Sequence, residues 1–282
     1  MKLIECPRDA MQGIETWIPT ETKINYLNQL LQVGFDTLDF GSFVSPKAIP
    51  QLKDTADVLS GLNLDTTTTK LLAIIANARG ASDACQFDEI QYLGYPFSIS
   101  EEFQKRNTNA TIEESLGRVE QIVELANQHK KEVVLYLSMG FGNPYGEPYS
   151  PEIAAQWCRR LYDLFEVKIM ALSDTIGVSN PENISGLFST LIPELDQVEF
   201  GAHLHSTAET RMEKLQAAYS SGCRRMDSAI KGWGGCPMAE DELVGNMATE
   251  TVLEFLDGIS VNPGVDRDAF NQAMIQSASV FP

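Results

Sequence analysis

The clearest candidates for chemistry in this chain are two histidines separated by a single residue, His203 and His205. Side chains two positions apart on a β-strand face the same side, with Cα atoms ~6.6 Å apart, so two imidazoles can converge on one metal ion. The alternative interpretation is a pair of hydrogen-bonded structural histidines. Further ligands are needed to decide between the two.

Asp9 and Asn246 are the residues that could complete a metal site. One carboxylate, two imidazoles and one amide leave room for substrate oxygens in an octahedral shell around a divalent ion. Such a site suits an anionic substrate that chelates the ion. Taken singly, Asp9 could instead cap a loop, and Asn246 could be a turn residue.

A glycine-rich loop from Lys231 to Pro237 carries a cysteine, Cys236, beside Gly234 and Gly235. Glycine lets such a loop open and close over a site, where the thiol could donate or accept a proton. The alternative is a tight turn with an inert buried thiol. The remaining cysteines, Cys6, Cys85, Cys158 and Cys223, lie in apolar contexts and are interpreted as core residues.

Composition excludes several classes of protein. The 282 residues carry a formal net charge of −18, which repels nucleic acid and anionic membranes. No apolar run approaches the ~20 residues needed to span a bilayer. The five cysteines form no C-x-x-C pair, which favours a reducing, cytoplasmic location. Because an apolar run begins at Leu3, we expect no signal or transit peptide.

The elements that must position these residues alternate between short β-rich runs and helical patterns, which is typical of parallel βαβ units. Expected strands are Lys2–Cys6, Thr37–Phe40, Leu71–Ala76, Glu89–Gly94, Val133–Ser138, Lys168–Ser173, Val198–His205 and Arg225–Ile230. Eight strands predict a (β/α)8 TIM barrel. The rival is an open doubly wound sheet, but the first β-to-α turn lacks a dinucleotide-binding glycine fingerprint.

Helix start signals agree with this alternation. Thr111 and Glu114 have the spacing of a capping box, and Ser150 and Asn180 each precede a proline that suits the first helical position. We expect one catalytic domain over residues 1–282, with the barrel at about 1–258 and a terminal helix at about 264–280.

Polar residues gather at the expected strand ends, where TIM barrels place their catalytic groups. Arg8 and Asp9 follow the first strand, Asp39 ends the second, Asp174 follows the sixth, and the two histidines end the seventh. The sequence therefore predicts one shared cleft at the C-terminal face of the barrel.

With these residues assembled, the chain resembles the 3-hydroxy-3-methylglutaryl-CoA lyase family of metal-dependent barrel lyases. The resemblance runs from Leu3 to about Gly258. It is carried by Pro7-Arg8-Asp9 with Gln12, Ser42-Phe43-Val44-Ser45-Pro46-Lys47, Asp174-Thr175-Ile176-Gly177-Val178, His203-Leu204-His205, Gly234-Gly235-Cys236-Pro237 and Gly245-Asn246.

The resemblance implies a role for each of these residues. Mg²⁺ or Mn²⁺ would be held by Asp9, His203, His205 and Asn246. The implied catalytic residues are Arg8, Cys236, Asp39 and Asp174, and the implied substrate-binding residues are Gln12, Ser42, Tyr136, Thr175, Gly234 and Gly235. The implied substrate is an acyl-CoA, and the implied assembly is a homodimer.

The implied reaction breaks a carbon–carbon bond in 3-hydroxy-3-methylglutaryl-CoA or a close 3-hydroxyacyl-CoA, giving acetyl-CoA and acetoacetate from the former. Arg8 would stabilise the enolate oxygen and Cys236 would reprotonate the carbon. His203 and Asp174 are both candidates for the base that removes the hydroxyl proton.

The chain departs from the family pattern in several places. Asp39 replaces the usual Glu and is one methylene shorter, so we expect a longer or water-bridged contact with Arg8 or a metal ligand. Glu15 stands where a lysine is common, Lys231 and Trp233 replace smaller or aliphatic residues, and one extra residue separates Cys236 from Asn246.

Two alternatives remain open. A Claisen-type acyl-CoA synthase, similar to isopropylmalate synthase, would share the Arg-Asp pair and the H-x-H motif but usually adds a C-terminal regulatory region and lacks the Gly-Gly-Cys-Pro loop. A non-catalytic barrel that binds acyl-CoA would not need a proton-transfer thiol at Cys236.

Overall fold

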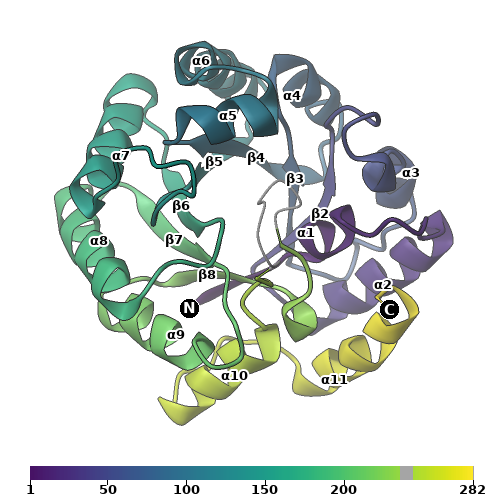
Figure 1. The fold of residues 1–282 in the computed structure, drawn as a ribbon. Helices are drawn as coiled ribbons and strands as arrows, with labels where there is room; N and C mark the ends of the chain where they lie inside the picture. The colour runs from purple at the N-terminus through teal and green to yellow at the C-terminus, as the bar shows by residue number, and fades with distance from the viewer. Residues whose placement is uncertain (236–243, 282) are drawn as a thin grey trace.

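Eight parallel β-strands close into a barrel, and helices surround it, in a computed structural model that describes residues 1–235 and 244–281 (Figure 1). The strands follow one another around the barrel in chain order, and β8 pairs with β1. They are β1 (Lys2–Glu5), β2 (Thr37–Ser42), β3 (Lys70–Ile74), β4 (Ile90–Ser98), β5 (Glu132–Ser138), β6 (Ile169–Asp174), β7 (Glu199–Leu204) and β8 (Arg225–Ser228). The prediction of a TIM barrel is confirmed, and the open doubly wound sheet is wrong.

Helices follow the strands around the outside of the barrel (Figure 1). The described residues contain α1 (Pro7–Gln12), α2 (Thr20–Val33), α3 (Thr55–Ser60), α4 (Ala78–Ala84), α5 (Glu101–Thr108), α6 (Ile112–Gln128), α7 (Pro151–Phe165), α8 (Pro181–Glu194), α9 (Arg211–Ser220), α10 (Thr249–Gly258) and α11 (Arg267–Gln276). Short 3₁₀ helices lie at η1 (Pro50–Leu52), η2 (Ile230–Gly232) and η3 (Ser277–Ser279). None of the described helices is long and apolar enough to cross a membrane.

The start signals act as the sequence predicts. Thr111 and Glu114 form a reciprocal capping box at α6. Ser150 caps α7 and Asn180 caps α8, each followed by proline in the first turn. These caps satisfy backbone N–H groups that have no partner within a helix, and so fix where each helix begins.

The strand bounds differ from expectation where tertiary pairing decides them. β4 continues to Ser98, four residues beyond the expected end, because its last residues pair with Leu135–Ser138 of β5. β7 ends at Leu204, and His205 instead forms an isolated antiparallel bridge with Asn246. The second histidine is therefore positioned by the returning chain as well as by its own strand.

The core has two layers, separated by the strand backbone. Alternate strand residues point outward to the helices, as Val133 and Leu135 do, or inward to the barrel axis, as Val134 and Tyr136 do. The inner layer also buries Arg225 completely. The interior of this barrel is therefore not purely apolar, because it contains a charged side chain.

A buried carboxyl group adds to the contacts where the barrel closes, and the last helix packs on the outside. Glu5 accepts hydrogen bonds from the Ile230 backbone N–H and the Thr249 hydroxyl, which links β1 to the segment after β8. The terminal helix α11 begins at Arg267, where Asp266 caps it, and lies beside α2 (Figure 1).

Candidate functional site

A short helix, α1, places the first functional side chains directly above β1. Pro7 occupies its first turn, and both Arg8 and Asp9 are buried. Arg8 Nη1 donates to Asp9 Oδ1 at 3.0 Å and to Gln12 Oε1 at 2.8 Å, and Gln12 Nε2 donates to Asp9 Oδ1 at 3.0 Å. The three residues form one hydrogen-bonded group, so that Asp9 is held in a single orientation.

Asp9, His203 and His205 bring one ligand atom each to within 4.8 Å of one another. The Nδ1 atom of His205 is buried and has no hydrogen-bond partner among the described residues. A buried nitrogen without a partner is costly unless something binds it. The donor set of two imidazoles and a carboxylate, with this free nitrogen, fits a divalent metal ion.

Asn246 is the fourth residue of this cluster. Its Nδ2 donates to Asp9 Oδ2 at 2.6 Å and to the backbone carbonyl of Trp233 at 2.9 Å. The amide oxygen is the atom left to serve as a ligand. Gly234 makes this approach feasible, because a Cβ at that position would lie 2.5 Å from Asn246 Nδ2, and its φ of +101° suits glycine.

His203 is supported by Asp227, a residue that sequence analysis did not single out. Its Nδ1 lies 3.1 Å from Asp227 Oδ2, and the Tyr136 ring packs edge-on against the imidazole at 5.5 Å between centroids. Burial lowers the pKa of His203, but the hydrogen bond and negative charge of Asp227 outweigh burial and raise that pKa overall. A carboxylate behind a histidine ligand fixes its ring and raises its basicity.

The other two members of the cluster are biased toward the forms that bind a cation. Burial and the neighbouring His203 lower the pKa of His205 to about 4, so its ring is neutral near pH 7. Burial raises the pKa of Asp9, but Arg8, the two histidines and the Asn246 hydrogen bond together outweigh burial, and the pKa falls below its usual value. Neutral imidazole and ionised carboxylate are the ligand forms that metal ions require.

Arg8 is held by Asp39, which is fully buried on β2. Arg8 donates from Nε at 2.9 Å and from Nη2 at 2.6 Å to Asp39 Oδ2. The expectation of a longer or water-bridged contact is therefore wrong. α1 brings the guanidinium close enough to β2 that the shorter aspartate reaches it directly.

Asp174 lies at the end of β6 but is paired away from the metal ligands. Its Oδ2 accepts from Lys214 Nζ at 2.9 Å and from Ser179 Oγ at 2.5 Å. Lys214, on α9, also donates to the backbone carbonyls of Gly177 and His205. This buried ion pair ties the end of β6 to the chain at His205.

Four of the six predicted substrate-binding residues divide into two groups. Gln12 and Tyr136 touch the cluster, and the Tyr136 hydroxyl is buried with no partner in the described parts of the chain. Ser42 and Thr175 are instead engaged by backbone, because Ser42 Oγ donates to the Ile74 carbonyl and Thr175 Oγ1 accepts from the Met139 N–H.

The glycine-rich loop is described only in part. Gly234 and Gly235 precede the segment 236–243, so Cys236 lies outside the described residues. Of the departures in this region, Trp233 stacks on Phe281 with ring centroids 5.6 Å apart, and Lys231 donates from its backbone to Glu250. Glu15 is exposed, outside the buried cluster.

Asp227 and Lys214 are the supporting residues that sequence analysis missed. β8 reads Arg-Met-Asp-Ser, and its two charged residues, Arg225 and Asp227, lie two positions apart on a short strand, which is the available signal for Asp227. Lys214 is spaced like any surface lysine on an amphipathic helix, and the sequence holds no sign that it is buried.

Comparison with known proteins gives the same picture. A sequence model of the HMGL-like family matches residues 3–275. The rat "3-hydroxy-3-methylglutaryl-CoA lyase, cytoplasmic" is 33% identical over 269 residues, covering 94% of this chain and 77% of the rat protein. A Pseudomonas aeruginosa protein named 3-hydroxy-3-isohexenylglutaryl-CoA/hydroxy-methylglutaryl-CoA lyase is 32% identical, covering 97% of this chain and 90% of that protein.

The structural comparison agrees. An HMG-CoA lyase from Acinetobacter baumannii, solved in complex with coenzyme A and 3-methylmalate, superposes with a TM-score of 0.90 at 30% sequence identity. The match covers 99% of this chain and 90% of the Acinetobacter chain.

Proposed function

This chain belongs to the HMGL-like family, and we propose that it is a carbon–carbon lyase that cleaves 3-hydroxy-3-methylglutaryl-CoA to acetyl-CoA and acetoacetate. The observation that carries the proposal is the convergence of Asp9, His203 and His205 beside Arg8. The name of the Pseudomonas relative makes a longer substituent at carbon 3 the first variation of substrate to test.

Asp9, His203, His205 and the amide oxygen of Asn246 would hold the metal ion, Mg²⁺ or Mn²⁺. When bound, the ion would act as a Lewis acid that polarises substrate oxygens and favours loss of the hydroxyl proton. The hydrogen bonds from Arg8, Gln12 and Asn246 to Asp9 keep that carboxylate in place before substrate arrives.

Arg8 would stabilise the charge that develops when the bond between carbons 2 and 3 breaks. The electron pair of that bond moves onto the thioester, and its oxygen becomes an enolate. Burial lowers the pKa of Arg8, but Asp39 and Asp9 outweigh burial and raise it, so the guanidinium stays charged. A fixed, buried cation aimed at a developing oxyanion is a large catalytic contribution.

Two proton transfers complete the reaction. The hydroxyl proton leaves as the ketone forms, and His203 and Asp174 are the two candidates for its acceptor. His203 would need one ring nitrogen free of the metal to accept this proton, and Asp174 already accepts from Lys214 and Ser179. Cys236 would then give a proton to carbon 2 of the enolate, producing acetyl-CoA.

The compounds that the protein turns over distinguish a lyase from a Claisen-type synthase and from a binding protein. Purified protein with Mg²⁺ or Mn²⁺ should release acetyl-CoA and acetoacetate in equal amounts from 3-hydroxy-3-methylglutaryl-CoA. Turnover of only a longer 3-substituted analogue would keep the reaction and change the acyl group. A Claisen-type synthase would instead consume acetyl-CoA with a 2-oxo acid, and a binding protein would turn over none of these compounds.

Location and assembly complete the proposal. The four cysteines in the described part of the chain are free thiols, which agrees with a reducing compartment, and we propose a cytoplasmic location. We also propose a homodimer, which light scattering on the purified protein would test.

A further inference from the structure

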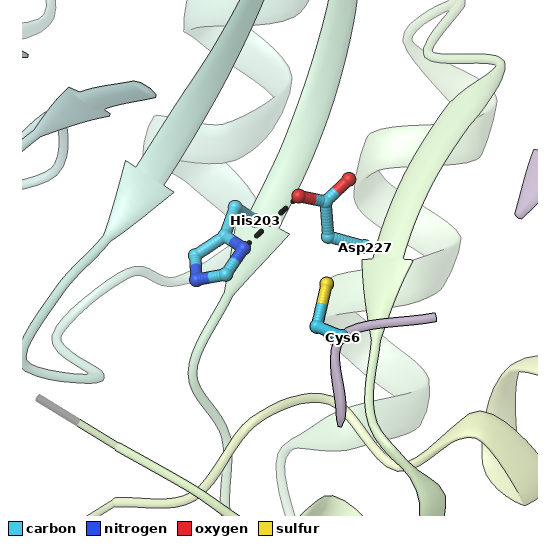
Figure 2. A group of neighbouring side chains, drawn as sticks. All are labelled: Cys6, His203 and Asp227. Atoms are coloured by element: carbon cyan, nitrogen blue, oxygen red, sulfur yellow. Dashed lines mark hydrogen bonds and ion pairs between the residues drawn. The ribbon is translucent and has the colours of Figure 1, made fainter. Parts of the chain in front are cut away.

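Cys6 is a buried core residue, as the sequence predicts, and it lies beside a metal-ligand candidate, His203. It lies between β1 and α1, at the position just before the helix begins, and its side chain is fully buried. Cys6, His203 and Asp227 each offer one ligand atom, and these three atoms lie within 4.8 Å of one another (Figure 2). A thiol, an imidazole and a carboxylate converge from β1, β7 and β8.

This cluster shares His203 with the Asp9 cluster. Nδ1 of His203 faces Asp227, and Figure 2 shows the second ring nitrogen pointing away from that carboxylate. One imidazole therefore lies between two groups of ligands, one with Asp9 and His205 and the other with Cys6 and Asp227.

Asp227 supplies an independent sign that this place suits a cation. Its side chain is 2% exposed, and its Oδ1 atom, which points away from His203 and Cys6 in Figure 2, has no hydrogen-bond partner within residues 1–235 and 244–281. A buried carboxylate that lacks a donor is costly, and a cation bound at its other oxygen, Oδ2, would offset its negative charge.

The charges around the cluster are mixed. Asp9, Asp39 and Asp227 contribute negative charge near Cys6, and Arg8 opposes them. Arg225 is the other buried cation near Asp227, but none of its guanidinium nitrogens has a hydrogen-bond partner among the described residues. Arg225 forms an ion pair with Glu199 at 3.8 Å and donates no hydrogen bond to Asp227.

We propose that Cys6, His203 and Asp227 form a second metal site, which takes a thiophilic divalent ion such as Zn²⁺ or Cd²⁺. Sulfur and imidazole ligands select such ions over Mg²⁺ and Mn²⁺, which prefer oxygen. On binding, the Cys6 thiol releases its proton to solvent as the metal–sulfur bond forms. The ring proton of His203 moves from Nδ1 to Nε2, and the freed Nδ1 lone pair binds the metal in place of its hydrogen bond with Asp227. The site does not depend on the lyase reaction.

The test is a Cd²⁺ titration of the full-length, reduced, metal-free protein, followed by the ultraviolet absorption of the cadmium–thiolate bond. The wild-type protein should show this absorption at one equivalent of Cd²⁺, and excess Mg²⁺ should leave it in place. Cys6→Ser should lose the signal. Cys158→Ser, which removes a buried thiol on α7, should retain it, and so should Cys236→Ser.

A second variant guards against loss of the signal through misfolding of Cys6→Ser. Asp227→Asn keeps the thiol but weakens the third ligand, so it should keep the absorption while lowering the Cd²⁺ affinity about tenfold or more. Absence of the absorption in wild-type protein, or an undiminished signal in Cys6→Ser, would overturn the proposal. Neither result bears on the lyase activity, which is measured with Mg²⁺ or Mn²⁺.

Discussion

Asp39 Oδ2 accepts two hydrogen bonds from Arg8, one from Nε at 2.9 Å and one from Nη2 at 2.6 Å. The two residues lie on different elements, β2 and α1, and both are buried. A guanidinium bound in this way cannot rotate, so its remaining Nη1 atom stays directed at Asp9 and Gln12. The pair thus connects the proposed enolate-stabilising group to the proposed metal ligand.

Replacing Asp39 with Asn should slow turnover by about 10–100-fold, because a supporting contact is lost while the groups that touch substrate remain. Steady-state kinetics with the metal at saturation would measure the effect. Asp39→Glu is the matched control, since it restores the charge with one more methylene. Equal activity of Asp39→Asn and wild type would show that Arg8 does not need this partner.

Replacing a metal ligand and replacing the proton-transfer thiol should have different effects on Mn²⁺ binding. His205→Ala removes a ligand and should abolish measurable Mn²⁺ binding, whereas Cys236→Ser should bind Mn²⁺ like wild type and turn over more slowly. Isothermal titration calorimetry measures the first property and kinetics the second. Normal Mn²⁺ affinity in His205→Ala would exclude this residue from the site.

Lys214→Met should destabilise the fold by about 3–5 kcal/mol, because it leaves the Asp174 carboxylate buried without its cation. Chemical denaturation would measure the change in the free energy of unfolding. Lys105→Met is a control on an exposed helix pair and should change that free energy by less than about 1 kcal/mol. A similar small change in Lys214→Met would show that the pair with Asp174 is not structural.

Glu5 should make the stability of the fold depend on pH. Burial raises the pKa of Glu5 from 4.5 to about 8 in the folded protein, so the folded state holds this proton more tightly than the unfolded state. The resulting stabilisation is complete below the unfolded pKa of 4.5 and is lost as pH rises through about 8.

Glu5→Gln removes this titration and keeps an acceptor for the Ile230 N–H. Relative to the variant, wild-type protein should lose up to about 1.4 kcal/mol of unfolding free energy per pH unit between the two pKa values. Urea unfolding at a series of pH values would show the divergence. Parallel pH profiles of the two proteins would mean that Glu5 is ionised in the folded state.

Much of the fold follows from sequence, because local signals and tertiary structure agree. The capping residues Thr111, Ser150 and Asn180 mark helix starts without any long-range information. The alternation of strands and helices specifies a parallel barrel, and polar residues at strand ends indicate its functional face. The end of β4 could not be placed, because only pairing with β5 extends that strand to Ser98.

The contacts that support the site could not be predicted from the sequence. That Asp39 reaches Arg8 depends on how α1 lies over β2, and spacing along the chain does not encode this distance. Burial of Lys214 depends on how α9 packs against the ends of β6 and β7. The apolar context of Cys6 predicts a core residue, but it does not reveal that its thiol lies close to His203 and Asp227.

The central claim is that Asp9 and the two histidines form the metal centre of a carbon–carbon lyase. Its most direct test is the release of acetyl-CoA from 3-hydroxy-3-methylglutaryl-CoA by metal-free protein to which Mg²⁺ or Mn²⁺ is added back. We predict release only with the metal, none after chelation, and none from Asp9→Asn. Release that persists without metal or in Asp9→Asn, or no release from this or any longer 3-substituted thioester by metal-loaded protein, would contradict the account.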